Sequence, residues 1–459
     1  MISRVFSRAS GTGISFCTDQ LLSSGALASF TKSLKTNTKT LAKTGFCIMN
    51  LLFWYKSKVE LEICTIFYII FIMQNTKREI EPELKRCAEY FPVVTILGPR
   101  QSGKTTLAKM FFPSHQYVNL EDPEIFALAQ NDINEFFNLF KAPVIIDEIQ
   151  RLPALLNKIQ VLADEKKQNG QFILTGSFQQ GLKSAISQSL AGRTAVINLL
   201  PYSISELLRI GKNLSKDEYL YQGFMPRHYS ENQPVDLLYR SYFQTYVERD
   251  VQSLLNVKHK NLFEKFLRLV AGRIGQVVNY ESLANDTGVS STTISEWISI
   301  LESSFIIFRL ETYFENFTKR LVKSPKIYFY DTGLACYLLG IKNAEQVSRD
   351  PLMGNLFENM TVLEILKSQY NKGEEKSLYY FRDSKGFEID LLIQNGRSIV
   401  PVEIKAASTF NAEFAKNLKK FAGFAKNAVN PTVVYSGNLE CESDGVRYLN
   451  FKRCGSLVE

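Results

Sequence analysis

The sequence has 459 residues, 45% of them hydrophobic, which is enough for roughly three globular domains with ordinary cores. Its net charge is +8, but the stretch up to Gln74 contributes +5 of this, so the remaining chain has too weak a basic field to indicate nucleic-acid binding by itself. The seven cysteines are odd in number and never form a Cys-x-x-Cys spacing. We therefore expect a reducing, cytoplasmic location and no zinc site.

Residues 1–72 differ from the rest of the chain because they are rich in Ser and Thr, basic and poor in acids at their start. Two apolar bursts follow, at 46–55 and 63–73, and both are shorter than the roughly 20 residues that span a bilayer. A targeting segment and a short membrane anchor are alternatives. The favoured interpretation is an atypical extension that is poorly ordered or not native, with Met73 as the working start and no stable membrane span.

Residues 93–106 contain the sequence pattern of a phosphate-binding loop. A five-residue apolar strand at 93–97 leads into Gly-x-x-x-x-Gly-Lys-Thr, in which glycines let the backbone approach a phosphate closely. Lys104 would reach the β- and γ-phosphates, and the Thr105 hydroxyl would ligate Mg²⁺. The expected nucleotide-binding residues are Gly98, Pro99, Arg100, Gln101, Ser102, Gly103, Lys104, Thr105 and Thr106. ATP and Mg²⁺ are the predicted ligands, because a complete guanine-reading Asn-Lys-x-Asp motif is missing.

An α/β pattern continues after this loop. We expect helices at 105–112, at 123–140 and before Ser189, and strands at 116–120, 142–148, 171–177 and 195–200. The strand that ends in Asp147 and Glu148 would deliver two acids to the carboxyl edge of a parallel sheet. Asp147 would hold the Mg²⁺ shell, and Glu148 would polarise the attacking water.

Two further residues are candidates for catalysis. Ser177 follows the third apolar strand, where it could contact the γ-phosphate or the water, or could be a hydroxyl of a loop turn. Arg193 follows a helix and could reach a neighbouring subunit's γ-phosphate, or could bond to the helix carbonyls. The first role for Arg193 needs a neighbour, so a homo-oligomer is expected.

Five motifs together resemble one family, the prokaryotic AAA-type ATPases that carry a C-terminal domain of unknown function. They lie at 98–106, 145–153, 174–177, 189–193 and 246–251, and the resemblance extends over about residues 77–450. The segment Gly-Phe-Met-Pro at 223–226 is similar to the family's Gly-Gly-Phe-Pro, with one glycine absent. The resemblance implies an ATPase without naming its client. The expected fold class is α/β, with a P-loop AAA-type parallel sheet covered by helices on both faces at 77–205.

A helical lid or linker is expected at 206–260, and a winged-helix module at 261–340. Its helices would be at 262–271, 280–287 and 291–302, before wing strands that begin at 304–313. No Lys or Arg lies between Arg273 and Arg309, which disfavours a DNA-recognition helix. Basic residues follow only at Lys319, Arg320, Lys323 and Lys326. The module is therefore interpreted as a protein-interaction or packing unit, with DNA contact through the wing as the alternative.

The last domain, at 350–455, has expected strands at 378–382, 388–393, 398–405 and 433–435 and a helix at 412–428. Asp390, then Glu403-x-Lys405, with the upstream helical Glu358, resembles the core of PD-(D/E)xK nucleases. Asp390, Glu403 and Glu358 would hold Mg²⁺, and Lys405 would help to orient or deprotonate water. The alternative is a nuclease-like fold in which these pairs are structural ion pairs.

Three functions remain open from the sequence. The first is an ATP-driven switch that changes how the C-terminal modules are presented to DNA or to an unknown protein client. The second is a Mg²⁺-dependent DNA or RNA nuclease regulated by ATP. The third is a nucleotide-gated binding module with little turnover, which the presence of Glu148 disfavours.

Overall fold

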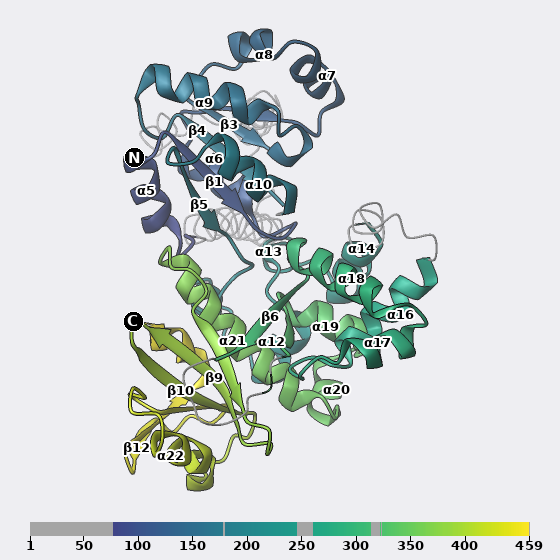
Figure 1. Ribbon diagram of the computed structural model, residues 1–459, viewed down its shortest axis with the longest axis vertical. Coiled ribbons are helices and arrows are strands. Elements are labelled where there is room, and N and C mark those ends of the chain that lie inside the picture. The colour runs from purple at the N-terminus through teal and green to yellow at the C-terminus, as the bar shows by residue number, and fades with distance from the viewer. Residues whose placement is uncertain (1–76, 178–179, 246–259, 314–321, 323, 459) are drawn as a thin grey trace, which may run out of the picture. The chain divides into compact units, whose positions relative to one another are not determined.

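The computed structural model describes residues 77–177, 180–245, 260–313, 322 and 324–458 (Figure 1). The extension at 1–72, the motif at 246–251 and the basic residues Lys319, Arg320 and Lys323 lie outside these ranges. Among the helices that the structure describes, none is long and apolar enough to cross a membrane.

The first sheet has five parallel strands in the order β2-β3-β4-β1-β5. Their bounds are β1 Val93–Leu97, β2 Gln116–Asn119, β3 Val144–Asp147, β4 Phe172–Gly176 and β5 Thr194–Asn198. All residues of β1, β3 and β4 are buried, as expected for central strands of a sheet that is covered on both faces. This parallel α/β sheet fits the P-loop ATPase fold.

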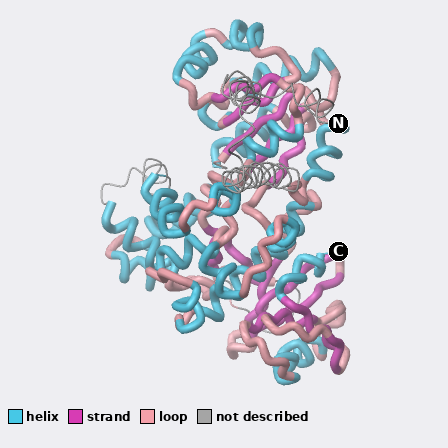
Figure 2. The backbone as a smooth tube through the Cα atoms, turned by 180° about the vertical axis from the view of Figure 1, so that it is seen from behind, coloured by secondary structure: helices cyan, strands magenta, loops and turns pink. Residues whose placement is uncertain are grey.

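Helices cover both faces of this sheet, as Figures 1 and 2 show. Alternate residues of β1 belong to different cores: Val94 and Ile96 pack with α5 and α6, whereas Val93 and Leu97 pack with α9 and α10. The helix bounds are α5 Glu81–Tyr90, α6 Lys104–Phe111, α7 Pro123–Asn131, α8 Ile133–Leu139, α9 Leu155–Lys166 and α10 Gln180–Ser189. A short 3₁₀ helix, η1 Ile149–Arg151, follows β3.

The single helix expected at 123–140 is wrong, because two helices are present there. Asp132 is extended and ends α7, and its carboxylate accepts a hydrogen bond from the backbone N–H of Glu135 to cap α8. An aspartate that caps a new helix competes with continuation of the previous one.

The middle of the chain is mostly helical. Its helices are α11 Ile204–Arg209, α12 Lys216–Gln222, α13 Pro226–Glu231, α14 Val235–Tyr242, α16 Lys260–Ala271, α17 Tyr280–Thr287, α18 Ser291–Ser303, α19 Thr332–Leu339 and α20 Ala344–Arg349. Gly288 ends α17 in a left-handed conformation, and the Ser290 side chain caps α18. The expected order of helix, glycine turn and helix is therefore present, while the winged-helix assignment stays a proposal.

The second sheet has eight strands in the order β12-β13-β11-β10-β9-β8-β6-β7. Their bounds are β6 Ile307–Thr312, β7 Lys326–Phe329, β8 Leu378–Arg382, β9 Glu388–Asn395, β10 Ser398–Lys405, β11 Thr432–Tyr435, β12 Cys441–Ser443 and β13 Val446–Asn450. The antiparallel pair β6–β7, which the sequence assigned to a wing, joins this sheet because β6 pairs in parallel with β8. The helix expected at 412–428 is shorter, with η3 Ala412–Ala415 followed by α22 Lys416–Ala422.

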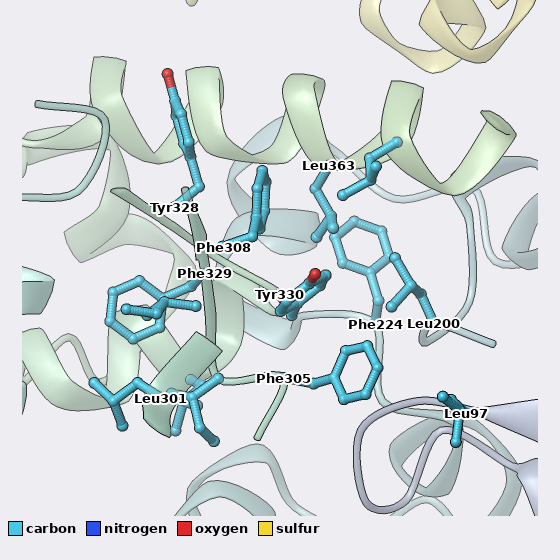
Figure 3. Close-up of a cluster of buried hydrophobic side chains, with 14 of the residues drawn as sticks. Leu97, Leu200, Phe224, Leu301, Phe305, Phe308, Tyr328, Phe329, Tyr330 and Leu363 are labelled. Carbon is cyan, nitrogen blue, oxygen red and sulfur yellow. The ribbon is translucent and has the colours of Figure 1, made fainter. Parts of the chain in front are cut away.

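The longest helix, α21 Met353–Asn371, contacts β5, β10, α12, α19 and the C-terminal 3₁₀ helix η4 Phe451–Val458. Buried residues lie all around it, so it forms part of one hydrophobic core that also contains residues from the first sheet. Figure 3 shows the ring of Phe224 between Leu363 of α21 and Leu200, with Leu97 at the end of β1 beyond them.

Candidate functional site

The loop between β1 and α6 is built around two glycines. A Cβ atom at Gly98 would collide with the carbonyl of Leu199. Gly103 has φ 93°, a left-handed conformation that favours glycine, and it immediately precedes α6. The loop therefore packs closely against the end of β5, and it leads directly into a helix N-terminus, which is the kind of place where proteins bind phosphates.

Lys104 is buried at the first position of α6. Its ammonium donates hydrogen bonds to the carbonyls of Gly98 at 3.0 Å and Pro99 at 2.7 Å. Burial lowers the pKa of Lys104 to about 8, and the nearby Glu148 and Asp147 carboxylates act in the opposite direction. The loop thus holds a cation whose charge is poorly solvated.

The carboxylate of Asp147, at the end of β3, binds three hydroxyl groups. The Thr105 hydroxyl donates to it at 2.9 Å, the Tyr117 hydroxyl donates at 2.8 Å, and the Thr175 hydroxyl donates as well. The structure thus brings together Thr105 and Asp147. Tyr117 and Thr175 were missed by the sequence reasoning, although their strands β2 and β4 flank β3 and place them beside it.

Glu148 lies just beyond the strand with φ 58°, an uncommon conformation for a residue other than glycine. Its carboxylate accepts hydrogen bonds from the Ser177 hydroxyl at 3.1 Å and from the Gln150 amide. The Gln150 amide also donates to the Ser177 hydroxyl at 3.2 Å. Glu148 and Ser177 are therefore in contact, and Gln150, which the sequence reasoning missed, bridges them.

Arg193 has a different environment. Its guanidinium donates to the Asp164 carboxylate of α9 at 2.6 and 2.9 Å and to the Ala191 carbonyl at 3.1 Å. Within the described chain, these hydrogen bonds tie Arg193 to α9 and to its own turn, and none of them joins it to Lys104, Asp147 or Glu148.

Arg78 supports the phosphate-binding loop from the other side. It is buried and donates to the carbonyls of Ser102 at 2.9 Å and Leu200 at 2.6 Å, and it pairs with Glu206 at 2.9 Å. Glu206 also completes the capping box of α11 with Ser203. The sequence signal was the Ser-x-x-Glu pattern at 203–206, but nothing in the sequence pairs it with Arg78.

These residues fit Mg-ATP by the chemistry of their donors. The two glycines shape a cradle for a phosphate, Lys104 supplies a cation, and Thr105 and Asp147 supply hard oxygen ligands of the type that Mg²⁺ prefers. Among the described residues, the Ser102 hydroxyl and the Gln101 side-chain oxygen are buried without a hydrogen-bond partner. Such buried polar atoms indicate a place for a polar ligand.

The second predicted set lies in the eight-stranded sheet. The Lys405 ammonium is 2.7 Å from the Glu403 carboxylate and 3.5 Å from that of Asp390. Glu358 is bound instead by Lys326, at 2.8 Å, and by a tyrosine hydroxyl. Over the described ranges, no group of three or more His, Cys, Asp or Glu side chains is arranged to hold a metal ion.

Comparison with known proteins finds a family match around the first sheet. Residues 90–208 match the model of a family described as an AAA domain. This match supports a P-loop ATPase that binds ATP. Residues 214–345 and 353–454 match two models that are each described as a domain of unknown function, DUF8612 and DUF4143.

Similar whole proteins are known from bacteria. Uncharacterized proteins of Mycobacterium bovis and Mycobacterium tuberculosis are each 29% identical over 342 residues, covering 72% of this chain and 74% of theirs. An uncharacterized protein of Haemophilus influenzae is 24% identical and covers 71% and 85%. Among solved structures, a Walker-type ATPase of Pyrococcus abyssi is 16% identical, with a TM-score of 0.37 and coverage of 57% and 95%. AMPPCP-bound DnaA from Aquifex aeolicus is 16% identical, with a TM-score of 0.27 and coverage of 49% and 85%.

Proposed function

We propose that this chain is an ATPase that hydrolyses Mg-ATP to switch its C-terminal helical and β-sheet parts between states. The observation that carries the proposal is the contact between Thr105 and Asp147 beside the buried Lys104. These residues lie within the AAA-domain match at 90–208, which supports ATP binding.

The proposed chemistry assigns one role to each side chain. Lys104 and the backbone N–H groups of the loop bind the phosphates, and Thr105 and Asp147 hold Mg²⁺, which neutralises charge on the phosphates. Glu148 accepts a hydrogen bond from the attacking water and orients it. Ser177 supports this role because its hydroxyl donates to the Glu148 carboxylate.

A buried chain of polar contacts supports the proposed switch. It begins at the Ser102 carbonyl in the loop and passes through Arg78 to Glu206 at the start of α11. Because these groups are buried, a shift of the loop on nucleotide binding would leave charges unsatisfied unless its partners moved as well.

The same chain continues from α11 into α21. The backbone N–H of Ile204 donates to the Glu364 carboxylate at 2.7 Å. Lys367 binds Glu364 at 2.6 Å and the Tyr202 carbonyl at 2.7 Å, and its ammonium lies 3.7 Å from the ring centre of Phe224. We infer that α21 is the element through which the nucleotide site acts on the C-terminal part.

Other assignments remain proposals with narrower support. A Mg²⁺-dependent nuclease is favoured by the contacts of Lys405 with Asp390 and Glu403. Arg193 can act in a homo-oligomer only if it exchanges its partner Asp164 for a neighbour's phosphate. DNA and a protein client are both compatible with a switch.

Phosphate release by the full chain tests the proposed function. We expect Glu148→Gln to bind ATP normally but to release phosphate about 100-fold more slowly or worse, because general-base catalysis is lost. Glu124→Gln, at an exposed position on α7, is the matched control and should keep full turnover. Unchanged turnover in Glu148→Gln would sink the assignment of the base, and ATP binding without turnover in either protein would indicate a nucleotide-gated binding module.

The same assay with double-stranded DNA distinguishes the clients. Turnover that rises with DNA would indicate a DNA-directed ATPase and would strengthen the nuclease proposal. Turnover that is indifferent to DNA would favour a protein client.

A further inference from the structure

Thr175 on β4 contacts both acids at the end of β3. The parallel pairing of these strands sets Ile146 opposite Leu174, so the residues that follow them, Asp147 and Thr175, lie at the same level. The buried Thr175 hydroxyl donates a hydrogen bond to Oδ1 of Asp147 and accepts one from the backbone N–H of Glu148 at 3.3 Å. One hydroxyl group therefore holds the carboxylate of Asp147 and the backbone of Glu148.

The backbone of Glu148 depends on such contacts. Its φ of 58° is a left-handed conformation that a residue with a side chain adopts only when its surroundings hold it there. The Thr175 hydroxyl binds its N–H group, and the Ser177 hydroxyl binds its carboxylate. The direction of the Glu148 side chain is therefore set in part by a hydroxyl of the neighbouring strand.

Tyr117 on β2 contacts Asp147 from the opposite side, since β2 and β4 flank β3 in the sheet. Its hydroxyl donates to Oδ2 of Asp147 at 2.8 Å, whereas Thr175 donates to Oδ1. The ammonium of Lys109, on α6, lies 3.4 Å from the centre of the Tyr117 ring, which is a favourable cation–π contact. Each oxygen of Asp147 is therefore held by a hydroxyl from a different flanking strand.

The Thr105 hydroxyl is the third donor to Asp147, and it lies 3.1 and 2.9 Å from the two oxygens. A carboxylate has about four lone-pair sites, and these three hydroxyls face them. In the proposed function Thr105 and Asp147 hold Mg²⁺, so Thr105 no longer directs its proton at the carboxylate. Tyr117 and Thr175 then remain, one on each oxygen, and keep the carboxylate in its orientation.

We propose that Tyr117 and Thr175 are positioning residues that hold the Asp147 carboxylate in the orientation that binds Mg²⁺, and that Thr175 also positions Glu148. This inference rests on the proposed ATPase function and extends it to two residues that act through the acids. Loss of the Tyr117 hydroxyl weakens metal binding alone. Loss of the Thr175 hydroxyl weakens metal binding and slows hydrolysis as well.

Binding of the ATP analogue AMPPCP to the full chain, with and without Mn²⁺, tests the first role in the absence of turnover. The ratio of the two affinities measures what the metal ion contributes. We expect Tyr117→Phe and Thr175→Val each to lower this ratio about 10-fold, an effect typical of residues that orient metal ligands, and to leave the affinity without Mn²⁺ unchanged. Thr175→Ser keeps a hydroxyl and should restore the ratio.

Thr95→Val is the matched control for both roles. Thr95 is also fully buried, lies on β1 of the same sheet and shares a hydrogen bond with Thr194 at 3.0 Å. The second role is tested by turnover at saturating Mg²⁺. Thr175→Val should lower kcat about 10-fold or more, because the catalytic base loses its backbone contact, whereas Tyr117→Phe should keep kcat within about threefold.

The outcomes separate the positioning role from the proposed function. A contribution of Mn²⁺ that survives in both Tyr117→Phe and Thr175→Val would overturn the positioning role and leave the ATPase intact. No contribution of Mn²⁺ in the wild-type chain would overturn the metal role of Asp147, and the positioning role with it. An equal loss in Thr95→Val would show a disturbed sheet instead. Tyr117 is only half-buried and its phenylalanine variant keeps the ring beside Lys109, so this variant decides the metal role even if Thr175→Val does not fold.

Discussion

At the scale of single residues, the candidate site contains a buried lysine, Lys104, whose charged form is destabilised by burial. The Lys104 ammonium is buried, so its pKa falls to about 8, whereas an unfolded lysine titrates near 10.5. Between these values the folded chain binds fewer protons than the unfolded chain, so the contribution of Lys104 to stability improves as pH rises through this window. At neutral pH, the charged Lys104 therefore lowers the stability of the fold, and phosphates in the loop would relieve this cost.

Binding of Mg-ATP should therefore take up protons in alkaline solution. Phosphates raise the pKa of Lys104, so at about pH 9 the complex should bind protons that the free chain has lost, whereas at about pH 7 Lys104 is already charged. Calorimetry in buffers of different ionisation enthalpy measures this uptake. Lys104→Arg stays charged throughout and should show none. Equal uptake at both pH values would contradict the prediction.

The side chains that meet at the site were only partly predictable. Lys104, Thr105 and Asp147 follow from local patterns, because a glycine-rich loop after a strand and an acid at a strand end are recognisable in sequence. Arg78, Gln150 and Thr175 act through side-chain contacts whose partners are set by folding. Arg78 and Glu206 are 128 residues apart, and no periodicity relates them.

At the scale of elements, the turn between α12 and α13 is hydrogen-bonded to Asp331, the residue that caps α19. The carboxylate of Asp331 accepts from the backbone N–H of Phe224 at 2.8 Å and from the Tyr239 hydroxyl at 2.6 Å, and it also caps α19. Gly223 fits beneath these groups with φ 65°, and a Cβ atom there would collide with both Tyr239 and Asp331. The segment at 223–226 therefore helps to hold α14 and α19 in place through its contact with Asp331 and Tyr239.

Gly223→Ala should destabilise the fold by about 3 kcal/mol, since it adds a collision to the cost of placing alanine at φ 65° and ψ −159°, a conformation that only glycine adopts readily. Gly211→Ala is the matched control. Gly211 has φ 77°, but nothing lies within 4 Å of its added Cβ, so only the conformational cost of about 1 kcal/mol is expected. Urea unfolding compares the two, and equal losses would show that the packing around Asp331 does not matter.

Elements were predictable where burial dominates their sequence. The strands β1, β3 and β4 are short apolar runs, and the structure confirms them within a residue or two at their ends. The hairpin β12–β13 was missed because β12 has only three residues, Cys441–Ser443, and the pattern Val-Arg-Tyr-Leu-Asn of β13 is too short to stand out. Pairing of β6 with β8 joins residues more than 60 positions apart, which a local pattern does not encode.

At the scale of the whole molecule, the hydrophobic core does not stop at the end of the ATPase sheet. One buried cluster contains Leu97 of β1, Phe224 from the turn between α12 and α13, and Leu363 of α21. The buried pair Glu364 and Lys367 lies on the same helix. Packed interiors switch between discrete arrangements and do not deform continuously. We therefore expect a movement of the phosphate-binding loop to displace α21 from one packed position to another.

A slowly hydrolysed ATP analogue should therefore change amide hydrogen exchange in α21. The double variant Glu364→Gln/Lys367→Met removes the buried ion pair without leaving one charge alone, and it should reduce this change while nucleotide affinity stays within about threefold. Lys372→Met is the control, because Lys372 is the C-cap residue of the same helix and its side chain donates to the carbonyl of Val458, away from Glu364 and Lys367. An unchanged exchange response in the double variant would refute the route through α21.

The continuity of the eight-stranded sheet has a consequence for dividing the gene. Strands β6 and β7 come before residue 340, and β8 to β13 come after it. If the chain were divided between them, the C-terminal polypeptide would lack β6 and β7, and the edge of β8 would be exposed. The N-terminal polypeptide would keep β6 and β7 as a two-stranded hairpin without its partner strand β8. Exposed strand edges promote aggregation. The two halves should then be insoluble when made separately, yet recover a common sheet when produced together in the same cell.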